Sequence, residues 1–135
     1  MRTPLVALLL LITLSANKCT KGFDPAALKE KKWIVETLNG RRPELPDGAE
    51  TPWLKLAGDQ LQGFGGCNAL MGSYALEGTK LSFSGIGSTK KYCEGIQPTE
   101  NAVKEMLGKV DSFSLDGNQL RLLGGGKELA QLRGE

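Results

Sequence analysis

The chain has 135 residues, with 17 Lys and Arg against 15 Asp and Glu, and it contains no histidine. Without histidine, the sequence excludes histidine acid–base catalysis, serine or cysteine catalysis that depends on histidine, and the usual histidine-containing zinc sites. Leaving out Arg2 and Lys18, the part from Cys19 onward has 15 cations and 15 anions. Because Arg41-Arg42 and Lys90-Lys91 are isolated pairs rather than a basic face, we do not expect binding to nucleic acid.

The first 18 residues have the pattern of a secretory signal. Arg2 supplies a positive charge, and an apolar run follows from Leu5 to Leu14. A helix needs about twenty residues to cross a bilayer, so this run is too short to span one. It fits the central region of a signal peptide. We therefore predict a signal peptide over residues 1–18 and an exported protein, located in the periplasm.

Two ways of processing this signal stay open. Ser15-Ala16 forms a small-residue cleavage site before Asn17, which would release a free periplasmic protein. Alternatively, Cys19 lies where a bacterial lipoprotein carries its lipidated cysteine, which would tether the protein to the membrane. Lys18 argues against lipidation, because lipoprotein signals have a small residue before the cysteine.

Residues 19–31 read as a polar tether, and residues 32–133 read as one domain. In the tether, Asp24 and Pro25 favour a single helical turn. From Lys32 the chain alternates short apolar runs with turns, at a spacing typical of an antiparallel sheet. We predict a mainly β, β-rich α+β fold: a small antiparallel curled sheet or barrel with one amphipathic helix. The turn signals are Asn39-Gly40, Asp47-Gly48, Gly58-Asp59, Asp116-Gly117 and Gly124 to Gly126.

One segment, QPTENAVKEMLGKVDS, breaks the strand pattern. Val103, Met106, Leu107 and Val110 recur at helical spacing, which predicts an amphipathic helix. Glu100 would lie near the positive end of this helix. Met106 is interpreted as part of the apolar stripe, and no cofactor or metal site is predicted. The helix would cover one opening or face of the sheet.

Four motifs follow one another along the chain: Trp33 with Leu38-Asn39-Gly40, then GGCNALMGSY, then STKKYC, then Glu100 at the start of the predicted helix. Their distinctive residues are Trp33, Asn39, Gly40, Gly66, Cys67, Asn68, Gly72, Tyr74, Thr89, Cys93 and Glu100. In these motifs the chain resembles the META domain, the family of the heat-shock protein HslJ, from about Lys32 to Arg133. The resemblance implies a small β-barrel-like fold with one helix, a place in the bacterial envelope and a link to stress tolerance. It implies no enzymatic reaction.

The two cysteines of the family motif correspond to Cys67 and Cys93. In an exported protein such a pair is a candidate disulfide, because that compartment is oxidising. The alternative is two small thiols buried in the core. Gly65 and Gly66 would let the backbone turn tightly, and Asn68 would hydrogen-bond the backbone of that turn.

The function expected from these features is a non-enzymatic envelope domain that binds a partner protein or an apolar ligand. The alternative is a thiol-redox protein using Cys67 and Cys93, in which Lys90 and Lys91 would favour a reactive thiolate at Cys93. Four aromatic side chains could line the binding surface of such a domain, or they could fill the core and rim of a barrel. They are Trp33, Trp53, Phe64 and Tyr74.

Overall fold

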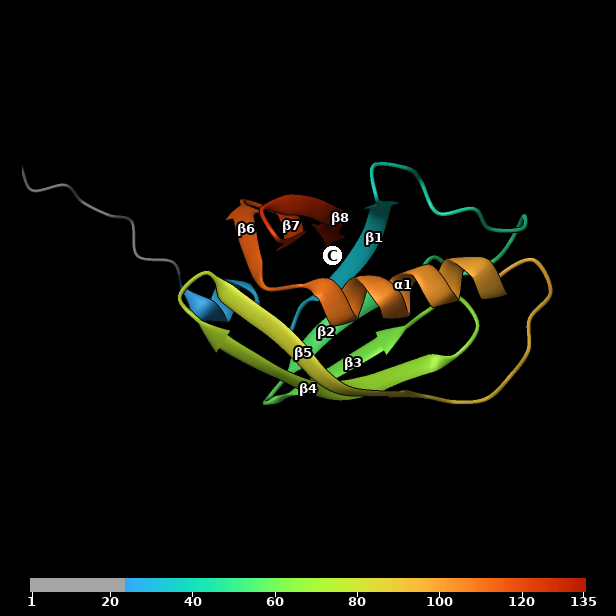
Figure 1. Cartoon of the computed structure of the whole chain (residues 1–135), viewed down its shortest axis with the longest axis horizontal. Helices are drawn as coiled ribbons and strands as arrows, with labels where there is room; N and C mark the ends of the chain where they lie inside the picture. The colour runs from blue at the N-terminus through green and yellow to red at the C-terminus, as the bar shows by residue number, and fades with distance from the viewer. Residues whose placement is uncertain (1–23) are drawn as a thin grey trace, which may run out of the picture.

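The computed structural model describes residues 24–135, which form eight antiparallel strands and one α-helix (Figure 1). Each strand except the last pairs with the next one along the chain, and β8 pairs with β1, so the sheet closes into a barrel. The predicted β-rich fold is therefore confirmed. The strands are β1 Lys32–Leu38, β2 Trp53–Ala57, β3 Gln60–Phe64, β4 Ala69–Glu77, β5 Lys80–Ser88, β6 Ser112–Asp116, β7 Gln119–Gly124 and β8 Lys127–Gly134.

The barrel interior is built from the apolar residues that alternate along each strand. In β2, Leu54 and Leu56 are buried while Trp53 and Lys55 lie on the outer side. Successive side chains of a strand point to opposite faces, so this alternation places one row inside. Trp33 of β1 is only 1% exposed. The cavity left among these side chains has a volume of about 10 Å³, so the barrel is filled by its own residues.

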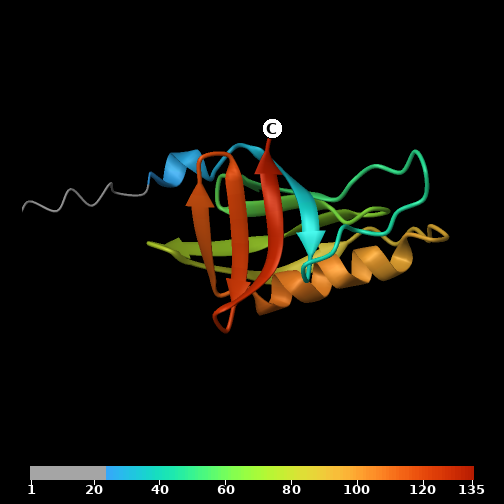
Figure 2. The same cartoon turned by 90° about the horizontal axis from the view of Figure 1, so that it is seen from above.

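Helix α1, Gln97–Lys109, connects β5 to β6 and packs against β5 and β1. Val103, Met106 and Leu107 are buried on its inner side, which confirms the predicted apolar stripe. Strands β5 and β6 are paired only at Lys80 and Ser112. Figure 2 shows α1 running along one side of the barrel, beside the ends of β6, β7 and β8. The helix thus covers the side on which the two strands separate.

The folded unit includes residues before Lys32, the start predicted from the sequence. Asp24 caps a short 3₁₀ turn, η1 Pro25–Ala27, by accepting a hydrogen bond from Ala26 N–H. Leu28 is fully buried, and its carbonyl accepts the indole N–H of Trp33 at 2.9 Å. The predicted signal peptide and Cys19 lie outside the described residues. Within residues 24–135 no helix is long and apolar enough to cross a membrane.

Candidate functional site

Most of the family motif lies at one end of the molecule. Figures 1 and 2 show η1 at one end of the long axis, and residues 41–52 and 89–96 at the other. The loop of residues 41–52 is fixed to α1 because Thr99 Oγ1 donates to the carbonyl of Glu44 at 2.6 Å. The turn of residues 65–68 reaches the same end, where the Cα of Gly66 lies close to Ile96. Three connecting segments therefore meet at the start of α1.

Glu100 is the buried centre of this end, with no exposed surface. Its Oε2 accepts the backbone N–H groups of Cys67 at 2.9 Å and Asn68 at 2.6 Å. Its Oε1 accepts the side-chain Nδ2 of Asn68 at 2.7 Å and lies 3.5 Å from Lys104 Nζ. A buried carboxylate is stable only where such partners replace water, and here both oxygens are satisfied.

Asn68 connects this carboxylate to the segment after β5. Its Oδ1 accepts from Thr89 Oγ1 at 2.8 Å and from the backbone N–H of Lys91 at 2.7 Å. Its Nδ2 also donates to the carbonyl of Lys91 at 2.9 Å. Asn68 is 2% exposed, and both ends of its amide are in use. We call Cys67, Asn68, Thr89, Lys91 and Glu100 the Glu100 cluster.

The pKa of Glu100 reflects two opposing effects. Burial acts to raise the pKa, because it disfavours the charged form. The side-chain and backbone hydrogen bonds from Asn68, the backbone N–H of Cys67 and the charge of Lys104 lower it. The net pKa lies below the ordinary value of 4.5, so Glu100 is ionised at neutral pH.

Two glycines allow the backbone to approach this carboxylate. A Cβ atom on Gly65 would lie 2.7 Å from Glu100 Cγ, which is too close for any other residue. Gly66 has φ +118°, a conformation that side chains with a Cβ rarely adopt. The predicted tight turn at these glycines is confirmed.

Cys67 and Cys93 form a disulfide, with their Cα atoms 5.8 Å apart. It joins the turn before β4 to the loop before α1, and it lies next to the hydrogen bonds of Asn68 to Lys91. The alternative of two separate buried thiols is therefore not what the structure contains. Covalent and polar links together hold residues 89–93 against the barrel.

The chemistry available in the Glu100 cluster is limited. An ionised carboxylate that already accepts several hydrogen bonds is poorly suited to remove a proton from a substrate. A carboxylate beside Cys67 also disfavours a thiolate at that position. Among residues 24–135, no group of acidic or cysteine side chains could hold a metal ion. The Glu100 cluster therefore has a structural role: together with the disulfide, it fixes the loop of residues 89–96.

The remaining motif residues lie elsewhere and have structural contacts. Trp33 is in the core, and Asn39 and Gly40 have φ values of 50° and 79° in the turn after β1. Gly72 leaves room for Ile86, since a Cβ there would lie 2.7 Å from Ile86 Cδ1. The hydroxyl of Tyr74 donates to the carbonyl of Gly58. These residues do not join the Glu100 cluster.

Two details of the motif differ from the sequence interpretation. The side chain of Asn68 does not bond the backbone of its own turn but that of Lys91, in a different segment. Glu100 lies in the first turn of α1, as predicted, but the sequence interpretation did not foresee that it is fully buried. Nothing in the local pattern around Glu100 signals its partners, because they come from residues 67 and 68.

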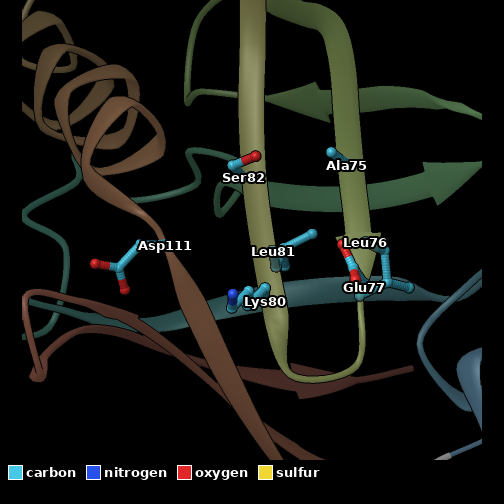
Figure 3. A pocket seen from close by; sticks show the side chains of 7 residues that line it. All are labelled: Ala75, Leu76, Glu77, Lys80, Leu81, Ser82 and Asp111. Atoms are coloured by element: carbon cyan, nitrogen blue, oxygen red, sulfur yellow. The ribbon is translucent and has the colours of Figure 1, made fainter.

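One hollow of the described surface lies away from this cluster. It has a volume of about 380 Å³ and is lined by residues of the β4–β5 hairpin and by Asp111. Figure 3 shows the carboxylate of Asp111 turned away from the hairpin, and this carboxylate accepts the N–H of Gly125 at 2.9 Å. Glu77 and Lys80 face each other across the hairpin turn. The hollow is an open depression, and no set of side chains converges in it.

Comparison with known proteins agrees with this geometry. An NMR structure of a protein from Burkholderia xenovorans is similar, with 29% identity, a TM-score of 0.66, and coverage of 84% of this chain and 89% of that one. A second NMR structure shares the fold at 21% identity, with a TM-score of 0.65 and coverage of 82% and 94%. No curated protein matches. The family model described as "META domain" matches residues 26–135, and the chain therefore belongs to the META domain family.

Proposed function

We propose that this chain is an exported, non-enzymatic envelope domain that binds a protein partner through the loop of residues 89–96. The observation that supports this is the contrast between the buried Glu100 cluster and the loop that it holds. Tyr92 lies between Lys91 and Cys93, which are both fixed, yet its own side chain is 79% exposed. An aromatic side chain presented on a rigid support is typical of a binding residue, because little entropy is lost when it is covered.

A partner on the surface is favoured over an apolar ligand inside the barrel. Small-molecule sites usually have volumes of about 300–1,000 Å³, whereas the apolar cavity in the barrel measures about 10 Å³. The thiol-redox alternative is less favoured, because Cys67 is almost fully buried and adjoins the Glu100 carboxylate. We infer that binding serves the stress tolerance that the family resemblance implies.

Site-specific crosslinking would test the partner. A photoreactive phenylalanine derivative would replace Tyr92 in the native host, and in a matched strain it would replace Ser114, an exposed residue of β6. We expect a discrete crosslinked protein, identified by mass spectrometry, from position 92 and not from position 114. Equal labelling from both positions, or no labelling from position 92, would contradict the proposal.

We further propose that Cys19 is lipidated and tethers the domain to the membrane. The described chain begins at Asp24, beside η1, at the end opposite the loop of residues 89–96 (Figure 1). The few residues between Cys19 and Asp24 reach about 17 Å at most when extended. A tether at Cys19 would thus turn Tyr92 away from the anchoring membrane, toward a partner.

Cell fractionation and intact mass would test the tether. We expect wild-type protein in the membrane fraction with added acyl mass, and soluble protein without that mass after Cys19→Ser. Two acyl chains give stable anchoring, since each buried methylene contributes about 0.8 kcal/mol. Soluble wild-type protein that starts at Asn17 would show that no tether exists.

A further inference from the structure

The outer wall of strands β1 to β4 carries an apolar row in register. Ile34 pairs with Trp53, Trp53 pairs with Phe64, and Phe64 pairs with Ala69. All four residues lie on the outer side of the barrel, between or beside the buried positions of their strands. Directly paired residues have their Cβ atoms about 5 Å apart, so the four side chains form one continuous strip.

Met71 extends this strip on β4, two residues after Ala69. Its side chain is 51% exposed, which is unusual for so large an apolar residue. A barrel strand with one solvated face normally alternates apolar residues inside with polar residues outside. We call the set of Ile34, Trp53, Phe64, Ala69 and Met71 the apolar face.

The opposite wall of the barrel, strands β6 to β8, has a row of polar residues on its outer side. Ser114 of β6 pairs with Arg121 of β7, and Arg121 pairs with Gln131 of β8. These three outward residues are all polar, whereas the paired row from Ile34 to Ala69 on the other wall is apolar. A contiguous apolar patch with a polar surround commonly marks an interaction surface.

The apolar face leads into the end that holds Tyr92. Ala69 follows Asn68 of the Glu100 cluster, and its carbonyl accepts the N–H of Thr89 at 3.2 Å. The apolar face and the loop of residues 89–96 are therefore neighbours, and one partner could contact both.

The charges around the apolar face indicate the chemistry of that partner. Glu94 of the adjoining loop has no ion pair among residues 24–135, but two acidic side chains beside the face are engaged. Glu50 accepts the indole N–H of Trp53 at 3.2 Å and lies 4.0 Å from Lys32 Nζ. Glu36 lies 3.8 Å from Arg133. By contrast, three cations beside the face or in the adjoining loop form no ion pair with any residue in 24–135. They are Lys55, Lys90 and Lys91.

We infer that the apolar face binds an acidic, apolar segment of a protein partner. This inference rests on the proposed function and names the chemistry of its partner. Apolar side chains of the segment cover Phe64 and Met71, while its carboxylates meet Lys55, Lys90 and Lys91. An anionic membrane is a poorer fit, because with the proposed tether at Cys19 the loop that carries Lys90 and Lys91 would face away from the anchoring membrane.

Two synthetic peptides would serve as probes for ¹⁵N NMR titration of the domain. One would carry glutamates interspersed with leucine and phenylalanine, and the other would have lysine in place of each glutamate. We expect the acidic peptide alone to shift the amide signals of β1 to β4, and added salt to weaken this binding. Equal binding of both peptides, shifts confined to β6 and β7, or no binding of the acidic peptide would overturn the inference.

Variants at the apolar face would show whether the acidic peptide binds there. Lys55→Glu and Met71→Asp should each weaken binding of the acidic peptide about tenfold, equivalent to about 1.4 kcal/mol. The matched controls are Lys127→Glu, at an exposed lysine without an ion pair among residues 24–135, and Ser114→Asp on the opposite wall. The controls should bind as wild type does. Equal losses in the controls would show that overall charge alone governs binding.

The remaining readouts separate this inference from the proposed function. Vesicles containing phosphatidylglycerol should not bind, and binding to them in place of the acidic peptide would overturn a protein partner of this kind. The crosslink from position 92 should weaken in Lys55→Glu and Met71→Asp proteins. A crosslink that persists unchanged in both variants would overturn the acidic partner and leave the proposed binding loop in place.

Discussion

Asn68 donates to both carboxylate oxygens of Glu100, from its backbone N–H to Oε2 at 2.6 Å and from Nδ2 to Oε1 at 2.7 Å. The two residues come from the turn just before β4 and from the first turn of α1. Each therefore fixes the other, and the carbonyl of the Asn68 amide carries the link onward to Thr89 and Lys91.

Replacing Glu100 by glutamine should destabilise the domain by about 3 kcal/mol. Glutamine keeps one acceptor oxygen, but its NH₂ group must then face one of the donors from Cys67 or Asn68. Urea unfolding followed by circular dichroism would measure the change. Glu105→Gln is the control on the same helix, where an exposed pair with Lys109 should cost no more than about 0.5 kcal/mol. Equal costs for the two variants would contradict the central role of Glu100.

The same carboxylate should make stability depend on pH in the acidic range. Because the pKa of Glu100 is lowered from 4.5 in the folded protein, the unfolded chain takes up the proton more readily. The stabilisation is present above pH 4.5 and is lost as the pH falls through the folded pKa. The free energy of unfolding would be measured at several pH values for wild type and for Glu100→Gln. The difference between the two proteins should become smaller below pH 4.5.

Asp111 provides an internal check on that measurement. The N–H of Gly125 and the hydroxyl of Ser112 lower its pKa from 3.8 as well. This carboxylate is present in both wild type and Glu100→Gln, so its effect cancels in their difference. A constant difference down to pH 3 would contradict the prediction for Glu100.

Alanine at Gly65 should destabilise the domain, whereas alanine at Gly108 should stabilise it. A Cβ at Gly65 would lie 2.7 Å from Glu100 Cγ and displace the carboxylate, at a cost of about 1–3 kcal/mol. A Cβ at Gly108 meets nothing within 4 Å, and alanine in a helix gains about 0.5–1 kcal/mol over glycine. Thermal unfolding of both variants should show opposite shifts in Tm. An unchanged or raised Tm for Gly65→Ala would mean that the close approach at Gly65 does not limit packing.

Reduction of the disulfide should lower stability without unfolding the barrel. Cys67 and Cys93 are 26 residues apart, and closing such a loop contributes about 3.5 kcal/mol in the chain-entropy model. The Cys67→Ser, Cys93→Ser double variant should keep its far-ultraviolet spectrum and lose stability near this amount. The reduction potential of the pair should lie below about −300 mV, as for structural disulfides. A readily exchanged bond would favour the redox alternative.

The strands and the helix could be predicted because their signals are local. The Gly58-Asp59 and Asp116-Gly117 turns separate strands that pair with each other, and the stripe from Val103 to Val110 needs only helical spacing. Each of these patterns reports on neighbours within a few residues along the chain.

The Glu100 cluster could not be predicted in the same way. Its bonds join residues 21 to 33 positions apart, between segments whose separate patterns give no hint of contact. Glu100 by itself looks like a surface residue at a helix start. The apolar face could not be predicted either, because in the sequence Trp53 and Phe64 are equally consistent with a place in the core. Only the register of β2 with β3 places them on the outside of the barrel.

The order of the strands also bears on how the chain folds. Most pairings join neighbours along the chain, from β2 with β3 to β7 with β8, and short loops close quickly. The pairing of Trp33 with Gly134 spans nearly the whole described chain, so its loop-closure entropy is the largest. The seam between β1 and β8 should therefore form last, after the hairpins are in place. Amide hydrogens of this seam should gain protection late in pulse-labelled refolding, which makes barrel closure the rate-limiting event.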